Sequence, residues 1–331
     1  MTATNHLIKR MTSKILIIGA CGQIGSELTL KLRAQNGNDN VVASDIGKSN
    51  MEVVNSGVFE IIDAQNKDQI KNCIQKYNID TVYLMAAMLS ATGEKYPMKA
   101  WDLNMDSLFN VLNLAKEKFI KKVFWPSSIA VFGPSTPKQN TPQYTSMEPT
   151  TVYGITKQVG ERWCEYYHKK YEVDVRSLRY PGIISWKTLP GGGTTDYAVE
   201  IYHKAITDKH YDCFLLENTK LPMMYMDDAV KATVGIMMAD ANAVKIRSSY
   251  NLSAISFTPQ EVAQSIKKHI QDFAINYTPD FRQSIADSWP QSIDDTHARQ
   301  DWGWEHEFSL EDITSEMLSQ LNKKYTNTLK N

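Results

Sequence analysis

Three side chains in the middle of the chain have the types and spacing needed to move a proton from an alcohol. Tyr153 and Lys157 are four residues apart in "YGITK", so on a helix they share one face. A tyrosine, with an ordinary pKa of about 10, is a poor base near neutral pH unless a cation stabilises its phenolate. Lys157 can be that cation, and Ser128 in "SSIAVFG" can hydrogen-bond the substrate oxygen. These three are the predicted catalytic residues, with Ser127 as the alternative serine.

Three glycines near the start of the chain, in "IIGACGQIG", predict a phosphate site. They follow an apolar run and lead into a helical pattern. Gly19 allows a tight turn, Gly22 lets the backbone approach a pyrophosphate, and Gly25 lets the helix pack closely on the sheet. The helix N-terminus then offers free N–H groups to the phosphates. The spacing is G-x-x-G-x-x-G, which differs from the G-x-G-x-x-G dinucleotide fingerprint.

An acidic residue at the end of the second apolar run selects between two dinucleotides. Asp45 lies twenty residues beyond Gly25. A carboxylate there can accept hydrogen bonds from a ribose diol and would repel a 2′-phosphate, which favours NAD over NADP. Asp63, at the end of the third run, is placed to reach an adenine edge.

Apolar runs alternate along the chain with stretches of helical periodicity, and these elements must position the predicted site residues. Ile24, Leu28 and Leu32 recur every four residues after the first run. Continuous apolar strands separated by helices indicate a parallel sheet covered on both faces. The predicted fold class is therefore α/β, a Rossmann-type doubly wound sheet. The expected strands are 14–19, 40–44, 58–63, 80–87, 121–128 and 173–182.

The pattern changes after residue 182. The stretch "SWKTLPGGGTTDY" (185–197) contains a proline and three consecutive glycines, so it is predicted to be a loop. We expect residues 1–13 to be a disordered tail and 14–182 to be the dinucleotide-binding domain with the catalytic residues. Residues 183–331 are expected to form mainly a smaller substrate-binding lobe, with some elements returning to the sheet. Ligands should bind between the two parts, at the carboxyl ends of the strands.

Composition argues against several classes of protein. The formal net charge is −1, which gives no reason to expect nucleic acid as a partner, and no apolar run is long enough to span a bilayer. The four cysteines are widely spaced and the seven histidines form no ligand set, so neither a disulfide framework nor a metal site is expected. A cytoplasmic location is expected, with the mitochondrial matrix as the alternative if residues 1–13 are a presequence.

The motifs together resemble the extended short-chain dehydrogenase/reductase family over residues 14–320. In that family a serine about 25 residues before the tyrosine begins an S-x-x-V-Y/F-G stretch, and Ser128 fits this placement. Asn104 resembles the structural asparagine of the family. "RYPG" (179–182) resembles its turn beside the nicotinamide, and "MMYMDDAVKA" (223–232) resembles its later helix start.

Longer stretches resemble one group within that family, the metal-independent L-threonine 3-dehydrogenases. They are "PSSIAVFGP", "TTVYGITK", "RYPGIISWKTLPGGGTTDYAVEIY" and "SWPQSIDDTHARQDWGW". The resemblance implies that Tyr153 takes the proton of the C3 hydroxyl of L-threonine while the C3 hydride passes to NAD. The product would be L-2-amino-3-oxobutanoate. The residues expected to contact NAD are Gly19, Gly22, Gln23, Ile24, Gly25, Asp45, Asp63, Ala64, Leu84, Ala86, Ala87, Tyr153, Lys157, Tyr180 and Pro181.

The substrate would be a small zwitterion, whose carboxylate needs hydrogen-bond donors. Thr194 and Thr195 follow the three glycines and could supply them, and Ser90 is a further candidate. Residues 191–193 would let this loop close over the ligand, and Trp289 could cap the pocket. Ser128 and Tyr153 complete the expected substrate set.

Two other functions remain open at this point. A sugar-nucleotide epimerase or dehydratase would share Ser128, Tyr153 and Lys157, and a non-catalytic NAD-sensing regulator would share the fold. By analogy with the family, a homodimer is expected through helices at about 98–119 and 153–171. The unstable product makes a partner such as a 2-amino-3-oxobutanoate CoA ligase plausible.

Overall fold

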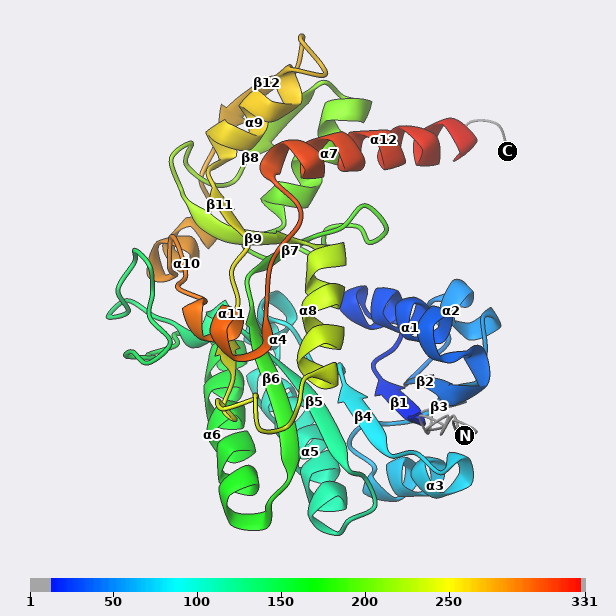
Figure 1. Cartoon of the computed structure of the whole chain (residues 1–331). Coiled ribbons are helices and arrows are strands. Elements are labelled where there is room, and N and C mark those ends of the chain that lie inside the picture. The colour runs from blue at the N-terminus through cyan, green and yellow to red at the C-terminus, as the bar shows by residue number, and fades with distance from the viewer. Residues whose placement is uncertain (1–12, 329–331) are drawn as a thin grey trace, which may run out of the picture.

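A seven-stranded parallel sheet forms the larger part of the molecule in the computed structural model, which describes residues 13–328 (Figure 1). The strand order is β10-β6-β5-β4-β1-β2-β3, and every neighbouring pair is parallel. The tail expected at residues 1–13 lies, apart from Ser13, outside the described residues. The strands are β1 (Ile15–Ile18), β2 (Val41–Asp45), β3 (Phe59–Ile61), β4 (Thr81–Leu84), β5 (Lys122–Ser128), β6 (Asp174–Tyr180) and β10 (Tyr250–Asn251).

Helices cover both faces of this sheet. Alternate residues of β1 belong to different cores, with Ile15 and Ile17 in one and Leu16 and Ile18 in the other. The first core includes residues of α1 (Gln23–Asn36), α2 (Met51–Asn55) and α8 (Met226–Met238). The second includes residues of α3 (Lys67–Tyr77), α5 (Pro97–Lys116) and α6 (Val152–Tyr171). The predicted Rossmann-type fold class is confirmed.

Three short elements connect these layers. They are the 3-10 turns η1 (Asn38–Asn40) and η2 (Ile129–Val131) and the helix α4 (Ser90–Lys95). η2 follows directly from β5, and α4 directly precedes α5. Both therefore lie next to segments that carry predicted site residues.

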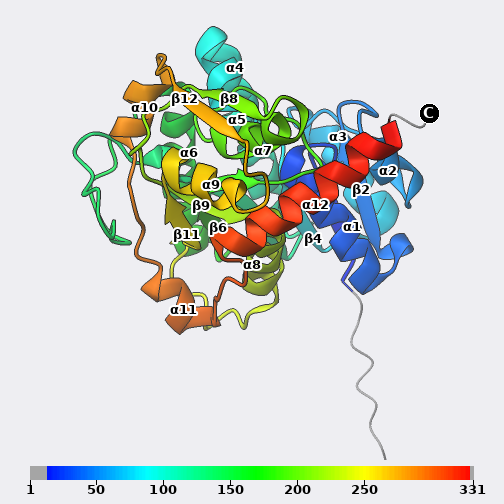
Figure 2. The same ribbon diagram turned by 90° about the horizontal axis from the view of Figure 1, so that it is seen from above.

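The smaller lobe has its own core around two small sheets. One has the order β11-β9-β7 and the other pairs β12 with β8. In the view from above, α12 runs diagonally across the molecule (Figure 2). The lobe's strands are β7 (Gly182–Ile184), β8 (His210–Cys213), β9 (Leu221–Tyr225), β11 (Ile255–Phe257) and β12 (Ala274–Tyr277). Its helices are α7 (Tyr197–Thr207), α9 (Pro259–Lys267), α10 (Arg282–Ser288) and α12 (Leu310–Thr328). The helix α11 (Thr296–Trp302) instead packs with the core of the large sheet that contains α1, α2 and α8.

The chain crosses between the two parts more than once. It leaves the large sheet after β6, enters the small sheet at β7 and returns as α8 and β10. Residues 185–196 contain no helix or strand, as predicted, before α7 begins. The division of the chain at residue 182 remains a prediction. None of the helices within residues 13–328 is long and apolar enough to cross a membrane.

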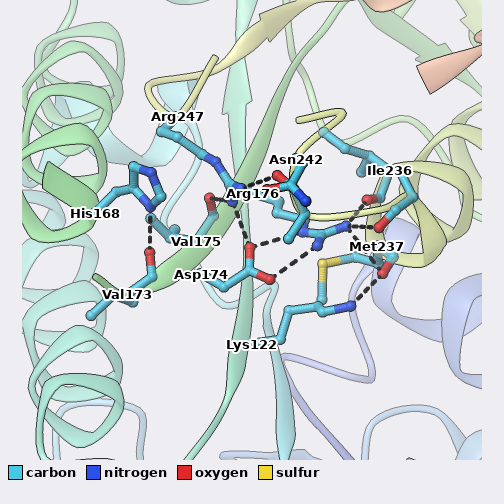
Figure 3. Close-up of polar contacts among 12 residues, drawn as sticks. Lys122, His168, Val173, Asp174, Val175, Arg176, Ile236, Met237, Asn242 and Arg247 are labelled. Atoms are coloured by element: carbon cyan, nitrogen blue, oxygen red, sulfur yellow. Dashed lines mark hydrogen bonds and ion pairs between the residues drawn. The ribbon is translucent and has the colours of Figure 1, made fainter. Parts of the chain in front are cut away.

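A buried charge cluster fixes α8 onto the sheet (Figure 3). Asp174, the first residue of β6, accepts hydrogen bonds from Arg176 at 2.9 Å and Arg247 at 2.5 Å. Arg176 also donates to the carbonyls of Ile236 and Ala239 at the end of α8. The positive guanidinium thus meets the negative end of the helix dipole. The cluster lies at the start of β6, so the opposite end of the parallel sheet is left for the predicted catalytic residues.

Candidate active site

The turn between β1 and α1 depends on two of the three glycines for steric reasons. Gly19 has φ +88°, and a Cβ there would lie 2.4 Å from the backbone nitrogen of Ala86. A Cβ on Gly25 would lie 2.1 Å from the carbonyl oxygen of Gly19. Neither position tolerates a larger residue, because the backbone of the turn and the segment after β4 occupy the space.

The N-terminus of α1 is suited to an anion. Gly22 is its N-cap and carries no side chain, and the first turn, with Gln23 and Ile24, has no acidic residue. A Cβ on Gly22 would meet only the Gly19 carbonyl oxygen within 4 Å, at 3.4 Å, so its other side is open. Open space before free helix N–H groups fits a diphosphate. The residues present therefore fit NAD.

Asp45 is held against the glycine turn. It ends β2, and its carboxylate accepts hydrogen bonds from the backbone N–H of Cys21 at 2.9 Å and of Ile46 at 2.8 Å. Asp63, two residues beyond β3, accepts from the N–H of Gln65 at 2.9 Å and is half-buried. Both acids lie after strand ends of the large sheet, where the sequence places the adenosine half of NAD. Leu84 ends β4, and Ala64, Ala86 and Ala87 follow the ends of β3 and β4.

Ser128 and Tyr153 come together at the end of β5. Ser128 is the last residue of that strand, and its hydroxyl oxygen accepts a hydrogen bond from the N–H of Ala130 at 3.2 Å. Tyr153 lies in the first turn of α6, and its hydroxyl is close enough to the side chain of Ser128 for the two to interact. Thr151 caps that helix by accepting from the N–H of Gly154. The cap fixes where α6 starts and therefore where Tyr153 lies.

Lys157 is buried one turn further along α6, with 2% of its surface exposed. Its ammonium group donates a hydrogen bond to the carbonyl oxygen of Pro126 at 2.6 Å. It also lies 4.6 Å from the ring centre of Trp125 and 5.4 Å from that of Tyr153. These contacts place a cation beside the ring of the predicted base.

Burial favours the neutral form of both titratable side chains, Tyr153 and Lys157. It raises the pKa of Tyr153 to about 12, against the effect of the Ser128 side chain. It lowers the pKa of Lys157 to about 7, while Cys164 and Glu161 act in the opposite direction. A positive charge that entered the site would favour the phenolate. Burial therefore favours the protonated form of Tyr153, and the phenolate depends on positive charge nearby, which the ammonium group of Lys157 can supply.

Asn104 links three elements behind the site. It accepts a hydrogen bond from the N–H of Met88 at 2.8 Å and donates to the hydroxyl of Thr156 on α6 at 3.1 Å. Its side chain is 4% exposed, so its role is structural, in line with the resemblance. Ser90 begins α4, whose Glu94 accepts from the N–H of Val152 at 2.8 Å. This bond ties α4 to the first turn of α6, which carries Tyr153.

The loop after β7 folds back onto the end of the large sheet. Thr195 lies against Gly182, where a Cβ would be 2.7 Å from the methyl carbon of Thr195. Thr194 is buried, and Asp196 accepts hydrogen bonds from the N–H groups of Gly191 and Gly193. Gly182 directly follows Pro181, which follows the last residue of β6. Thr194 and Thr195 are therefore near the segment predicted to lie beside the nicotinamide.

Tyr180 and Trp289 are packed more deeply than expected for simple ligand contacts. The hydroxyl of Tyr180 is hydrogen-bonded to Thr233 on α8, so the backbone of residues 180–181 is the part left to face a cofactor. Trp289 is 8% exposed and lines a cavity with Lys138 and Gln291. Trp289 belongs to the core of the smaller lobe, and Tyr153 packs against that core.

Two buried charges beside the site had no counterpart in the sequence prediction. Glu161 and Arg179 form a bidentate ion pair next to Lys157 and Ser128. The spacing of Lys157 and Glu161, four residues apart on a helix, is the signal that could have pointed to the first of them. Within residues 13–328 there is no group of three or more His, Cys, Asp or Glu that could hold a metal ion.

Comparison with known proteins agrees with this geometry. The family model described as "NAD dependent epimerase/dehydratase family" matches residues 15–253. An uncharacterized epimerase/dehydratase of Staphylococcus haemolyticus is 47% identical over 316 residues, which cover 95% of this chain and 99% of that protein.

Two solved structures are similar over nearly the whole length. One is the holo form of a GalE-like L-threonine dehydrogenase from Cupriavidus necator, 53% identical with a TM-score of 0.91, covering 93% of this chain and 99% of that one. The other is L-threonine dehydrogenase from Clostridium difficile, 48% identical with a TM-score of 0.93, covering 95% and 99%. They confirm the resemblance stated from the sequence, and the family confirms the prediction of NAD as cofactor. The chain belongs to the NAD dependent epimerase/dehydratase family.

Proposed function

We propose that this protein is an NAD-dependent L-threonine 3-dehydrogenase. One observation carries the proposal: the chain aligns over nearly its whole length with L-threonine dehydrogenases at about half sequence identity. The assembly of Ser128, Tyr153 and Lys157 at the carboxyl end of the sheet, beside a glycine turn that fits NAD, supports it.

The side chains divide the work of oxidising the C3 hydroxyl. Ser128 hydrogen-bonds the hydroxyl oxygen and holds it near Tyr153, whose phenolate takes the hydroxyl proton. Lys157 stabilises that phenolate by its charge. NAD, when bound, supplies the acceptor for the C3 hydride. The products are L-2-amino-3-oxobutanoate, NADH and one proton, so atoms and electrons balance.

The substrate contacts are proposed on weaker geometry than the acid–base set. Thr194 and Thr195 are assigned to the substrate carboxylate, since their loop packs on Gly182, and Ser90 to the same ligand from α4. Trp289 is assigned to the rim of the pocket. Residues 191–193 provide the flexibility for the loop to close.

The test is NADH formation at 340 nm. Purified protein receives NAD with L-threonine, D-threonine, L-allo-threonine or UDP-glucose, and NADP replaces NAD in a control. We expect a signal with L-threonine and NAD, and no loss of it on addition of EDTA. An epimerase or dehydratase returns the hydride to its sugar and forms no net NADH, so this alternative, which the name of the staphylococcal relative keeps open, is tested by chromatography of the nucleotide sugars after incubation with UDP-glucose. Conversion of UDP-glucose to another nucleotide sugar, without oxidation of L-threonine, would favour it. Tight NAD binding without turnover of any alcohol would favour a regulator.

Three further properties are part of the proposal. The protein forms a homodimer through α5 and α6. It works in the cytoplasm, where its four free cysteines stay reduced; a mitochondrial location would depend on residues 1–13. Its product is an unstable β-keto acid, which a downstream enzyme such as a 2-amino-3-oxobutanoate CoA ligase would consume.

A further inference from the structure

Glu161 is a fully buried carboxylate whose hydrogen bonds all come from the region of the site. It lies on α6, one turn beyond Lys157, and has no exposed surface. Arg179 donates to both of its oxygens, at 2.8 and 2.7 Å, and the hydroxyl of Ser127 donates to one of them at 2.7 Å. A buried pair of this kind is weak evidence for stability, because desolvation offsets the attraction. The position of the Glu161–Arg179 pair, beside the predicted site, indicates a role other than stability.

The partners of Glu161 are sequence neighbours of predicted site residues. Ser127 precedes Ser128 at the end of β5, and Arg179 precedes Tyr180 at the end of β6. Arg179 also donates to the carbonyl oxygen of Gln143 at 3.0 Å and to the side chain of Asn251 at 2.9 Å. The ion pair therefore joins α6 to two strand ends and to β10.

The surroundings of Lys157 contain few charges. From β5 it faces the Pro126 carbonyl and the Trp125 ring, and from its own helix the ring of Tyr153. The titratable groups that favour its charged form are Cys164 and Glu161. Burial raises the pKa of the Cys164 thiol well above its usual value, so this group is neutral. Glu161 is left as the carboxylate that favours the charged form of Lys157.

We propose that Glu161 is a positioning residue that keeps Lys157 charged, and that Arg179 holds its carboxylate in place. The Glu161–Arg179 pair thereby supports the Tyr153 phenolate without touching substrate or cofactor. This inference rests on the proposed function for its catalytic consequence, but the charge of Lys157 can be measured without substrate.

The direct experiment follows Lys157 by NMR in cofactor-free protein labelled with ¹³Cε-lysine. The resonance is assigned by its absence from Lys157→Met. Burial sets the pKa of Lys157 to about 7, so it titrates in an accessible range. In Glu161→Gln a negative charge is lost and the Arg179 guanidinium is left unpaired. Both changes disfavour the ammonium form, so the midpoint should fall by about one pH unit.

Two matched variants separate charge from structure. Arg179→Lys keeps both charges but loses the bidentate geometry, and we expect the Lys157 midpoint to stay within a few tenths of a unit. Asp174→Asn breaks another buried ion pair at the other end of β6 (Figure 3) and should leave the midpoint unchanged although it destabilises the fold. An unchanged midpoint in Glu161→Gln, or an equal shift in Asp174→Asn, would overturn the proposal.

A variant that does not fold, and a wild type that lacks the proposed activity, can each be distinguished from a failure of the role proposed for Glu161. If Glu161→Gln does not fold, the double variant Glu161→Gln with Arg179→Met leaves no unpaired guanidinium, and a smaller shift of the same sign is expected; no shift would overturn the proposal. With L-threonine, kcat of Glu161→Gln should fall about tenfold while the KM for threonine changes little. If the wild type does not oxidise L-threonine, the proposed function fails, and the NMR titration still decides the role of Glu161.

Discussion

At the scale of single residues, the hydroxyl of Tyr153 is the group on which the proposed reaction depends. Removing it in Tyr153→Phe leaves the ring to pack beside Lys157 but leaves no phenolate to take the substrate proton. We expect kcat to fall by about 100-fold to 10,000-fold, the usual contribution of a general base. The Kd for NAD, measured by calorimetry, should change little. Activity within a few-fold of the wild type would contradict the assignment of Tyr153 as the base.

Asp45 should determine the preference between NAD and NADP. Asp45→Ala removes the carboxylate that is placed for the ribose and that accepts from the N–H of Cys21. We expect the Kd for NAD to rise about tenfold or more, since hydrogen bonds to charged groups contribute about 1.5–3 kcal/mol. Asp45→Asn is the matched control. It keeps an acceptor for Cys21 and loses the charge, so NADP discrimination should relax while NAD binding weakens less. Unchanged cofactor preference in both variants would move the ribose contact elsewhere.

The proximity of the proposed acid–base residues could be predicted because they carry local signals, whereas the contacts around them could not. Tyr153 and Lys157 are one helical turn apart, so their proximity follows from helix geometry. Arg179 is 18 residues beyond Glu161, on a strand, and no spacing rule relates the two. The bond between Tyr180 and Thr233 likewise joins β6 to a helix far along the chain. Such contacts depend on how elements pack, which a single sequence does not state.

At the scale of elements, α8 is held to β6 by Arg176. The Arg176 side chain is 1% exposed and reaches both Asp174 and the last carbonyls of α8. Arg176→Met leaves Arg247 as the remaining cation on Asp174 and removes the donor to the carbonyls of Ile236 and Ala239, so unfolding in urea should show a loss of about 3 kcal/mol. The KM for L-threonine should stay unchanged, because the cluster lies at the start of the sheet. The exposed pair of Lys169 and Glu165 is the control, and Lys169→Met should cost less than about 0.5 kcal/mol. Equal losses in both variants would contradict the capping role.

The elements of the large sheet were predictable, and those of the smaller lobe were less so, for one physical reason. Most strands of the large sheet are covered on both faces and are therefore mainly apolar, and all six runs expected before residue 183 are strands β1 to β6. The buried arginines of β6, Arg176 and Arg179, depart from this pattern. In the smaller lobe the strands are three to five residues long, and polar side chains interrupt β8 and β12. β10 has two residues, and its place beside β6 depends on pairing across the chain.

At the scale of the whole molecule, exposed aromatic side chains of α6, packed beside α5, distinguish this face from an ordinary polar surface. Trp163 and Tyr166 on α6 are 37% and 46% exposed, and Trp163 packs edge-on against Phe109 of α5 at 5.0 Å. Burying such rings would be a sizeable gain from pairing two copies. Tyr153, the proposed base, lies on the same helix, so a dimer would also hold α6 from outside.

Sedimentation of the wild type should therefore give a species of twice 37.6 kDa. Trp163→Lys places a charge among the rings and should yield the single chain at micromolar concentration, because an unpaired charge inside an interface is costly. Phe281→Lys, at an exposed aromatic of the smaller lobe, is the control and should leave the dimer intact. A wild type that sediments only as one chain would refute the dimer. A dimer that persists in Trp163→Lys but not in Phe281→Lys would instead place the interface on the smaller lobe.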